Sequence, residues 1–244
     1  SDPKVQCWGQ SSAFAGLSIV NNYASAQGAI PPISITVGSN HNCAIMENGK
    51  LICWGDNTHG QIASIQNEPT VDLGTGRTAI AVDAGSDHTC AILDDQSIKC
   101  WGSNSHGQLG DGTTVDRFTP TAVDLGTGRT AIDVAAGDDF TCAILDNGKI
   151  KCWGSNRYGQ IGPNVGTALN SNYLNPISFS TGERTATSIT AGGSFACAIL
   201  DDISTICWGD NSKGQLGDRT VCRVGTDDFS NGCNGAGGKS EPTI

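Results

Sequence analysis

The chain has 244 residues, of which 24 are acidic and 14 basic, with a formal net charge of −10 and 6% aromatic residues. This acidity, with basic residues scattered rather than clustered, argues against binding to nucleic acid, which needs a cationic surface. No apolar stretch approaches the ~20 residues that cross a bilayer, so we expect no membrane insertion.

One sequence motif, which we call the repeated phrase, recurs along the chain. Half of it, "VQCWGQ", lies at Val5–Gln10, and full copies begin at residues 43, 90, 142 and 197. A period near 50 is found in β-propeller blades and in helical repeats. The 33 glycines and the turn signals between short apolar segments favour β-strands. The tryptophans of the phrase are Trp8, Trp54, Trp101, Trp153 and Trp208, which are 46, 47, 52 and 55 residues apart.

The third full copy shows the strands expected in each unit. We predict strands at Ala131–Gly137, Phe140–Leu145 and Lys149–Gly154, and a short fourth strand that begins within Gly159–Gly162. The "DNG" between the second and third strands predicts a tight hairpin. Trp153 lies on the opposite face of its strand from the cysteine beside it, so we expect it to pack between neighbouring sheets.

The hairpin explains most of the 11 cysteines. Pairing outward from Asn147 places Cys142 opposite Cys152, where facing Cβ atoms lie about 4.5–5.5 Å apart, or closer at non-hydrogen-bonded pairs. The spacing fits zinc poorly, and we predict no metal or cofactor. Repeated disulfides favour an exported protein, extracellular or at the cell surface, although free buried cysteines in a cytosolic protein are the alternative. The predicted pairs are Cys43/Cys53, Cys90/Cys100, Cys142/Cys152 and Cys197/Cys207.

Three cysteines fall outside these hairpins. Cys222 and Cys233 most simply pair within their own insertion, which leaves Cys7 without a partner. Alternatively, Cys7 bonds to one of those two cysteines and closes a small ring irregularly.

Radial repetition of small sheets makes a propeller. We therefore predict an all-β fold, a β-propeller of about five four-stranded blades with stapled hairpins, or part of a larger propeller. It would form a single domain, 1–244, with repeat units of roughly 1–31, 32–70, 71–122, 123–177 and 178–244.

The combined pattern "AAG-x-x-F/H-x-CAIL…CWG-x-N-x-x-GQLGDG" resembles the repeat of the regulator of chromosome condensation family. "VDLGTGRTAI", at 71–80 and 123–132, looks like the version common in exported microbial proteins. The resemblance implies a β-propeller, usually of seven blades, but no single activity, because members include an exchange factor for a small GTPase, a secreted β-lactamase inhibitor and surface modules. The chain departs from the family because "CWG" occurs five times but "CAI" only four times. Its final "SEPTI" matches "RFTPTAV", which we assign to the start of a first strand.

Strand order places the turns after the first and third strands of each unit at one end of the blades. His41, His88, Phe140 and Phe195 share one column and are expected to pack inside. The Asn that follows "CWG" is the same in all four full copies, so we expect its side chain to hydrogen-bond the backbone of its own turn.

Residues that differ between copies are not needed by the blade and are candidates for ligand contacts. The ligand-binding candidates are Asn40, His59, Asp87, His106, Asp139, Arg157, Tyr158 and Lys213.

No nucleophile elbow or phosphate-binding loop is present, so we predict no enzyme and no catalytic residue. The favoured function is an extracellular recognition or adhesion module that binds a protein or carbohydrate on another cell or surface. It could belong to an oligomer within a larger surface protein. The alternatives are a secreted inhibitor of a hydrolase and, less favoured, an exchange factor for a small GTPase.

Overall fold

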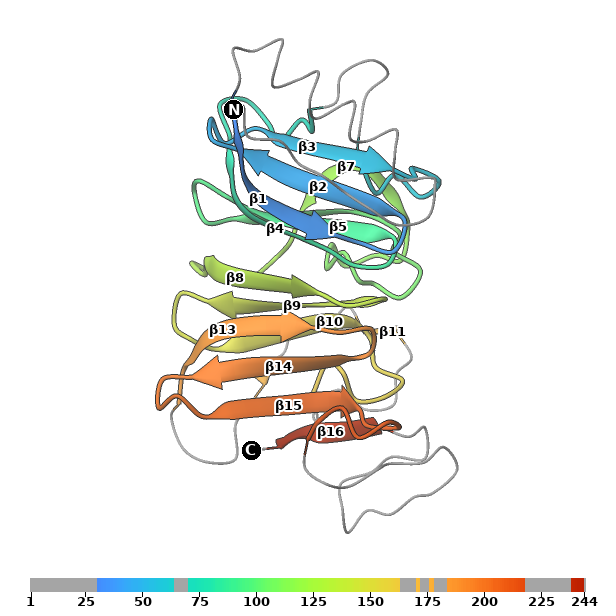
Figure 1. The fold of residues 1–244 in the computed structure, drawn as a ribbon, viewed down its shortest axis with the longest axis vertical. Coiled ribbons are helices and arrows are strands. Elements are labelled where there is room, and N and C mark those ends of the chain that lie inside the picture. The colour runs from blue at the N-terminus through green and yellow to red at the C-terminus, as the bar shows by residue number, and fades with distance from the viewer. Residues whose placement is uncertain are drawn as a thin grey trace.

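The computed structural model describes residues 30–63, 70–162, 170–171, 176–177, 184–217 and 238–243, which contain β-strands, turns and loops. The strands form four separate antiparallel sheets that follow one another in chain order (Figure 1). We call these sheets the first to fourth blades. No helix in these residues is long and apolar enough to cross a membrane.

Each blade runs in simple meander order. The first contains β1 (Pro32–Val37), β2 (His41–Met46) and β3 (Leu51–Gly55). The second contains β4 (Ala79–Ala84), β5 (His88–Leu93), β6 (Ile98–Gly102) and β7 (Arg117–Ala122). The third contains β8 (Ala131–Ala136), β9 (Phe140–Leu145) and β10 (Ile150–Ser155), with β11 (Asn170–Ser171) and β12 (Pro176–Ile177) both paired to β10. The fourth contains β13 (Ala186–Ala191), β14 (Phe195–Leu200), β15 (Thr205–Asp210) and β16 (Gly238–Thr243).

The fourth strands differ from the prediction. Gly159–Gly162 form a turn, in which the Gly162 N–H donates to the Gly159 carbonyl at 3.1 Å. Both glycines have positive φ, 79° and 97°, a conformation that ends an extended strand. The outer strand lies further along the chain, and β7, "RFTPTA", is such a strand rather than the start of a first one. β16 pairs with β15 in the same way, since Thr121 faces Cys100 and Thr243 faces Cys207.

The hairpins hold the predicted disulfides. Each of the four described pairs joins the second and third strands of a blade, with Cα atoms 4.0–4.1 Å apart. This close approach is typical of non-hydrogen-bonded positions facing each other across an antiparallel pair. Cys7, Cys222 and Cys233 lie outside the described residues, as does nearly all of the predicted unit 1–31.

Removing one hairpin disulfide is expected to lower the stability of the fold measurably. Because each disulfide closes a loop with a sequence separation of 10, Cys142→Ser/Cys152→Ser should lower the free energy of unfolding by roughly 2.5–3 kcal/mol. Urea unfolding without reductant would measure the loss, and reduced, alkylated wild-type protein is the control that lacks all the bonds. Equal unfolding midpoints for the variant and the oxidised wild type would mean that these two sulfurs are unpaired in solution.

The core lies between the blades. One face of each blade carries its disulfide, and we call it the disulfide face; the other carries the tryptophan, and we call it the tryptophan face. At the first junction, Ile45 and the Cys43–Cys53 bridge share a buried cluster with Leu93 and Trp101 of the next blade. The next two junctions repeat this arrangement. Trp101, Trp153 and Trp208 are therefore interblade packing residues, as predicted. Trp54 packs with residues of its own blade, and all four of these tryptophans are at most 1% exposed.

Candidate recognition face

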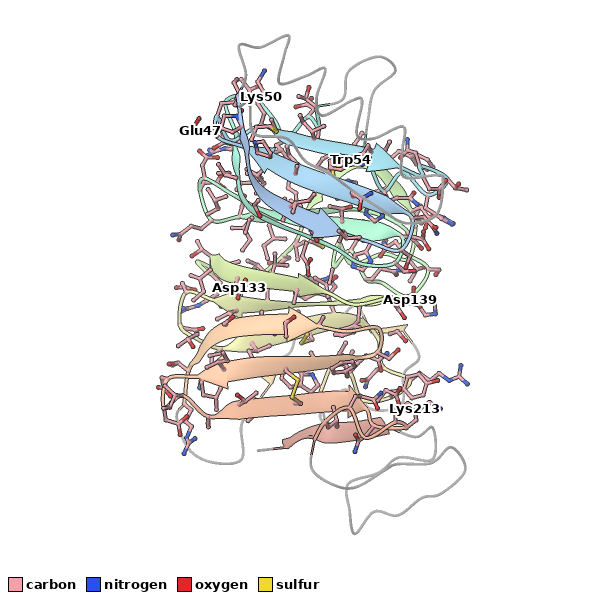
Figure 2. The ribbon with its side chains drawn as sticks, viewed as in Figure 1. Glu47, Lys50, Trp54, Asp133, Asp139 and Lys213 are labelled. Atoms are coloured by element: carbon pink, nitrogen blue, oxygen red, sulfur yellow. A yellow bond between two sulfur atoms is a disulfide. The ribbon has the colours of Figure 1, made fainter. Side chains whose placement is uncertain are left out.

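The turns after the first and third strands of a blade lie together. The residue that follows "CWG" donates its backbone N–H to the turn between the first two strands, from Asp56 to Asn40, and from Ser103 to Asp87, at 2.8–2.9 Å. The third and fourth blades make the equivalent bond. We call this end of the blades the loop face. In Figure 2, Asp139 and Lys213 lie at this end, whereas Glu47 and Lys50 lie at the opposite end, where the hairpin turns are.

The turn that follows each "CWG" has the same internal bonding in all four blades. The Asn side chain accepts from the backbone N–H five residues later, as between Asn104 and Leu109 at 3.0 Å. The Gln side chain accepts from the backbone N–H two residues earlier, at 2.7–2.9 Å. The residues whose backbone is held in this way are His59, His106, Tyr158 and Lys213.

The side chains displayed at these equivalent positions differ in chemistry. His59 Nδ1 lies 2.9 Å from Asp116 Oδ2, and this hydrogen bond raises the pKa of His59 above its usual value. His106 Nδ1 lies 3.9 Å from Asp139 Oδ1. In the third blade, the Arg157 guanidinium sits 5.5 Å from the centre of the Tyr158 ring. Lys213, in the fourth blade, is exposed.

Carboxylates surround these side chains. Gln61 Nε2 donates to Asp56 at 2.9 Å and to Asp87 at 3.3 Å, so it links two neighbouring blades. Partial burial, with the nearby charges of Asp139 and Asp87, raises the pKa of Asp138. Asn40 is exposed on its turn. The structure thus brings Asp139 next to His106, and Asp87 next to the turn that carries His59.

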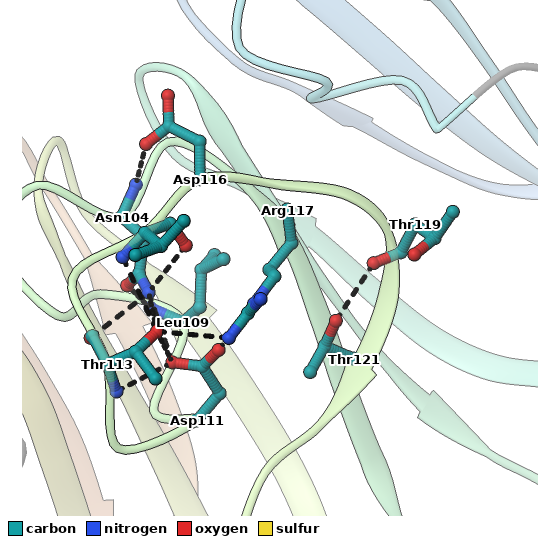
Figure 3. Close-up of polar contacts among 9 residues, drawn as sticks. Asn104, Leu109, Asp111, Thr113, Asp116, Arg117, Thr119 and Thr121 are labelled. Carbon is teal, nitrogen blue, oxygen red and sulfur yellow. Dashed lines mark hydrogen bonds and ion pairs between the residues drawn. The ribbon is translucent and has the colours of Figure 1, made fainter.

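Asp116 was not predicted from the sequence. Its Oδ1 accepts from the Asn104 backbone N–H at 2.8 Å while its Oδ2 contacts His59 of the first blade. Beside it, Asn104 Nδ2 donates to Asp111 Oδ1 at 3.1 Å, and Arg117 Nε donates to Asp111 Oδ2 at 2.6 Å (Figure 3). The only sequence signal is "GDGTTVDR", which follows "GQL" in the second copy alone.

The column of buried rings carries hydrogen bonds as well as packing. His41 Nε2 lies 2.7 Å from Thr89 Oγ1 of the next blade, and Thr89 donates its own proton to the Gln61 carbonyl at 2.9 Å. The threonine must therefore accept, so His41 carries its proton on Nε2. His88 and Thr141 repeat the pair at 2.8 Å. Burial lowers the pKa of His41 to about 4 and that of His88 to about 3.

These histidines are scaffold rather than site. Both histidines are at most 1% exposed. At the next junction, Phe140 takes the place of the histidine and Ala196 takes the place of the threonine, within one hydrophobic cluster. Among the residues that the structure describes, no group of three or more His, Cys, Asp or Glu side chains could hold a metal ion.

Comparison with known proteins identifies the repeat. The family model described as "Regulator of chromosome condensation (RCC1) repeat" matches residues 33–61, 79–108 and 131–160, and a second model with the same description matches 100–144. Human X-linked retinitis pigmentosa GTPase regulator is 28% identical over 193 residues, covering 79% of this chain and 14% of that protein. The ultraviolet-B receptor UVR8 of Arabidopsis thaliana is 29% identical over 226 residues, covering 88% of this chain and 50% of that protein.

Solved structures agree on the fold. Prp20p from Saccharomyces cerevisiae superposes with a TM-score of 0.68 at 20% identity, over 89% of this chain and 50% of that one. Human WBSCR16 gives a TM-score of 0.65 at 22% identity, over 74% of this chain and 48% of that one. The chain therefore spans half or less of the length of these four proteins, and the structures support a β-propeller of this repeat type.

Proposed function

The chain belongs to the regulator of chromosome condensation (RCC1) repeat family, and from that premise we propose that it is a non-catalytic recognition module that binds a protein or glycan through its loop face. One observation carries the proposal. Four turns with the same internal hydrogen bonds display a His, a His, a Tyr and a Lys at equivalent positions. The repeated residues are used by the scaffold, whereas the displayed side chains are not required by it.

The accessibility of the displayed side chains supports this division. The side chains of His59 and His106 are 43% and 39% exposed, whereas Gln61 and Gln108 beneath them are fully buried. A rigid backbone that presents partly exposed side chains loses little conformational entropy on binding. Arg157 stacked on Tyr158 supplies the residue types that most often anchor protein interfaces.

The proposed setting is extracellular or at the cell surface. Four disulfides in the described blades support an oxidising compartment, because cytosolic proteins rarely keep such bonds. In this setting the ligand would be a protein or a carbohydrate on another cell or surface.

A second candidate is a regulator that binds a small GTPase. It is favoured by two similar proteins: the human relative is called a GTPase regulator, and the Prp20p structure was described together with its binding to Gsp1p and histones. An acidic loop face could meet basic protein surfaces of that kind. A hydrolase inhibitor would use the same face and is a third form of protein recognition.

Binding selections would test the loop face directly. The purified chain would be screened on a glycan array and against a displayed peptide library, with nucleotide-free small GTPases as separate probes. We expect His106→Ala/Arg157→Ala/Tyr158→Ala to weaken binding of the selected probes by tenfold or more, because truncating such anchors typically costs over ~1 kcal/mol each.

The matched control lies at the other end of the blades. Arg129→Ala removes an exposed ion pair with Asp146, at 3.0 Å, and should leave the affinity unchanged. If the triple variant binds every selected probe as tightly as the wild type, the loop face is not the binding site. Selection of a GTPase alone would favour the second candidate over the extracellular one.

A further inference from the structure

The variable residues of the loop face include basic groups but no acids. We call the turns that follow "CWG" the outer turns. Their residue pairs that differ between copies are Thr58–His59, Ser105–His106, Arg157–Tyr158 and Ser212–Lys213. The chain as a whole has 24 acidic and 14 basic residues, so acids would be the commoner charged residues at positions without a requirement. The absence of acids from all four pairs therefore indicates a charge preference that the scaffold does not explain.

Two of these basic residues, Arg157 and Lys213, have no ion-pair partner among the residues that the structure describes. Each of the other described arginines pairs with an aspartate. They are Arg77, Arg117, Arg129 and Arg184. The two displayed histidines also face aspartates. Carboxylates outnumber cations in this chain, so Arg157 and Lys213 are not unpaired for want of acids. Both side chains are exposed and available to a ligand.

Both cations project from turns whose backbone is fixed. The backbone N–H groups of Tyr158 and Lys213 donate to the side chains of Gln160 and Gln215, at 2.7 and 2.9 Å. The Arg157 guanidinium lies 5.5 Å from the centre of the Tyr158 ring, and a guanidinium stacked on a ring can still bind a carboxylate through two of its N–H groups. The outer turns of the third and fourth blades thus present two cations and one aromatic ring.

Neither solubility nor a dense polyanion accounts for these cations. Each cation reduces the size of the net charge of −10, whereas solubility favours a charge far from zero. A nucleic acid or a sulfated glycan would also meet Asp138 on the same two blades. The Asp138 backbone N–H donates to the Gly193 carbonyl of the fourth blade at 2.8 Å, and its carboxylate lies against Gly193. That carboxylate would repel a ligand that carries a negative charge on every unit.

We propose that the loop face binds a protein partner through an acidic segment, whose carboxylates meet Arg157 and Lys213 while an apolar side chain packs on Tyr158. This inference rests on the proposed recognition function and names the chemistry of its partner. Charge-assisted hydrogen bonds from a guanidinium or an ammonium group to a carboxylate are among the strongest in proteins, and such pairs favour rapid and specific association. A protein segment can place a few acids at the outer turns and none beside Asp138, which a dense polyanion cannot do.

The first test reverses the charge of the outer turns. A displayed random peptide library would be selected on the wild type, on Arg157→Glu/Lys213→Glu, and on Lys50→Glu/Lys149→Glu, which makes the same charge change at the hairpin turns (Figure 2). We expect the wild type and the hairpin control to select peptides rich in Asp and Glu, and the loop-face variant to select peptides rich in Lys and Arg. Wild-type peptides with no excess of acids over the starting library would overturn the proposal, as would selection of glycans alone.

The second test measures the affinity of one selected acidic peptide. Arg157→Gln/Lys213→Gln removes both charges at similar size and should weaken binding about tenfold or more, whereas Lys50→Gln/Lys149→Gln should bind like the wild type. Raising the salt concentration should weaken the wild type but not the loop-face variant, because salt screens exposed charges. Equal affinities for the wild type and Arg157→Gln/Lys213→Gln would overturn the acidic partner. If the triple alanine variant still lost binding, the loop-face function itself would stand.

Discussion

Replacing Trp153 with alanine is expected to lower the free energy of unfolding by about 3–5 kcal/mol, the usual cost of removing a large buried aromatic side chain. Trp153 is fully buried and packs in the cluster that joins the second and third blades, which contains the Cys90–Cys100 bridge and Leu109. Its indole N–H donates to the Gln108 carbonyl at 2.9 Å. Urea unfolding monitored by circular dichroism would measure the loss.

The variant Trp153→Phe separates packing from hydrogen bonding. It keeps most of the ring but loses the bond to Gln108, so we expect a smaller loss, with about 1 kcal/mol from that bond. The Gln108 carbonyl would still accept from Thr141 Oγ1, at 2.8 Å, and would not be left unpaired. If the free energy of unfolding of Trp153→Ala lies within about 1 kcal/mol of the wild-type value, the tryptophan face is not buried between blades in solution.

Local patterns predicted the interior of each blade. In the third blade, the second strand was predicted with the bounds of β9, and the register across the hairpin places Cys142 opposite Cys152. Alternation of faces and turn chemistry act within a few residues, so they can be recognised in the sequence itself. The outer strands could not be found in this way, because β7 begins after a loop whose bonds, such as Arg117 to Asp111, are made by residues of one copy only.

Contacts between blades were harder to predict than contacts within them. Aligning the copies compares His41 with His88, but the bond that matters joins His41 to Thr89, one column and one repeat away. Once that offset is known, the sequence does show it, since the pairs run His–Thr, His–Thr and Phe–Ala along the chain. For the loop face, Asp116 escaped prediction as a partner of His59 for a different reason, because it lies in the "GDGTTVDR" segment that follows "GQL" in the second copy alone.

Acid is expected to destabilise the propeller through its two buried histidines. In the folded chain the pKa of His88 lies at about 3, against a usual value of 6.5, so between these values the unfolded chain binds a proton that the folded chain does not. The contribution of His88 to the free energy of unfolding is therefore fully present above pH 6.5. It is lost as the pH drops below that value, by about 1.4 kcal/mol per pH unit for each such histidine. His41 adds an equal slope down to its folded pKa of about 4. Urea midpoints measured from pH 7 to pH 4 would give the combined slope.

The protein itself contains the variant that isolates this effect. His88→Phe/Thr141→Ala reproduces the Phe140 and Ala196 pair of the next junction and should make the acid slope shallower by about 1.4 kcal/mol per pH unit. The change is tolerable because the larger ring faces a smaller partner, and the Gln108 carbonyl keeps its bond from Trp153. An unchanged slope in the double variant would mean that His88 is protonated in the folded blade. The hydroxyl of Thr141, already donating to Gln108, would then have to accept from an imidazolium without a counter-charge.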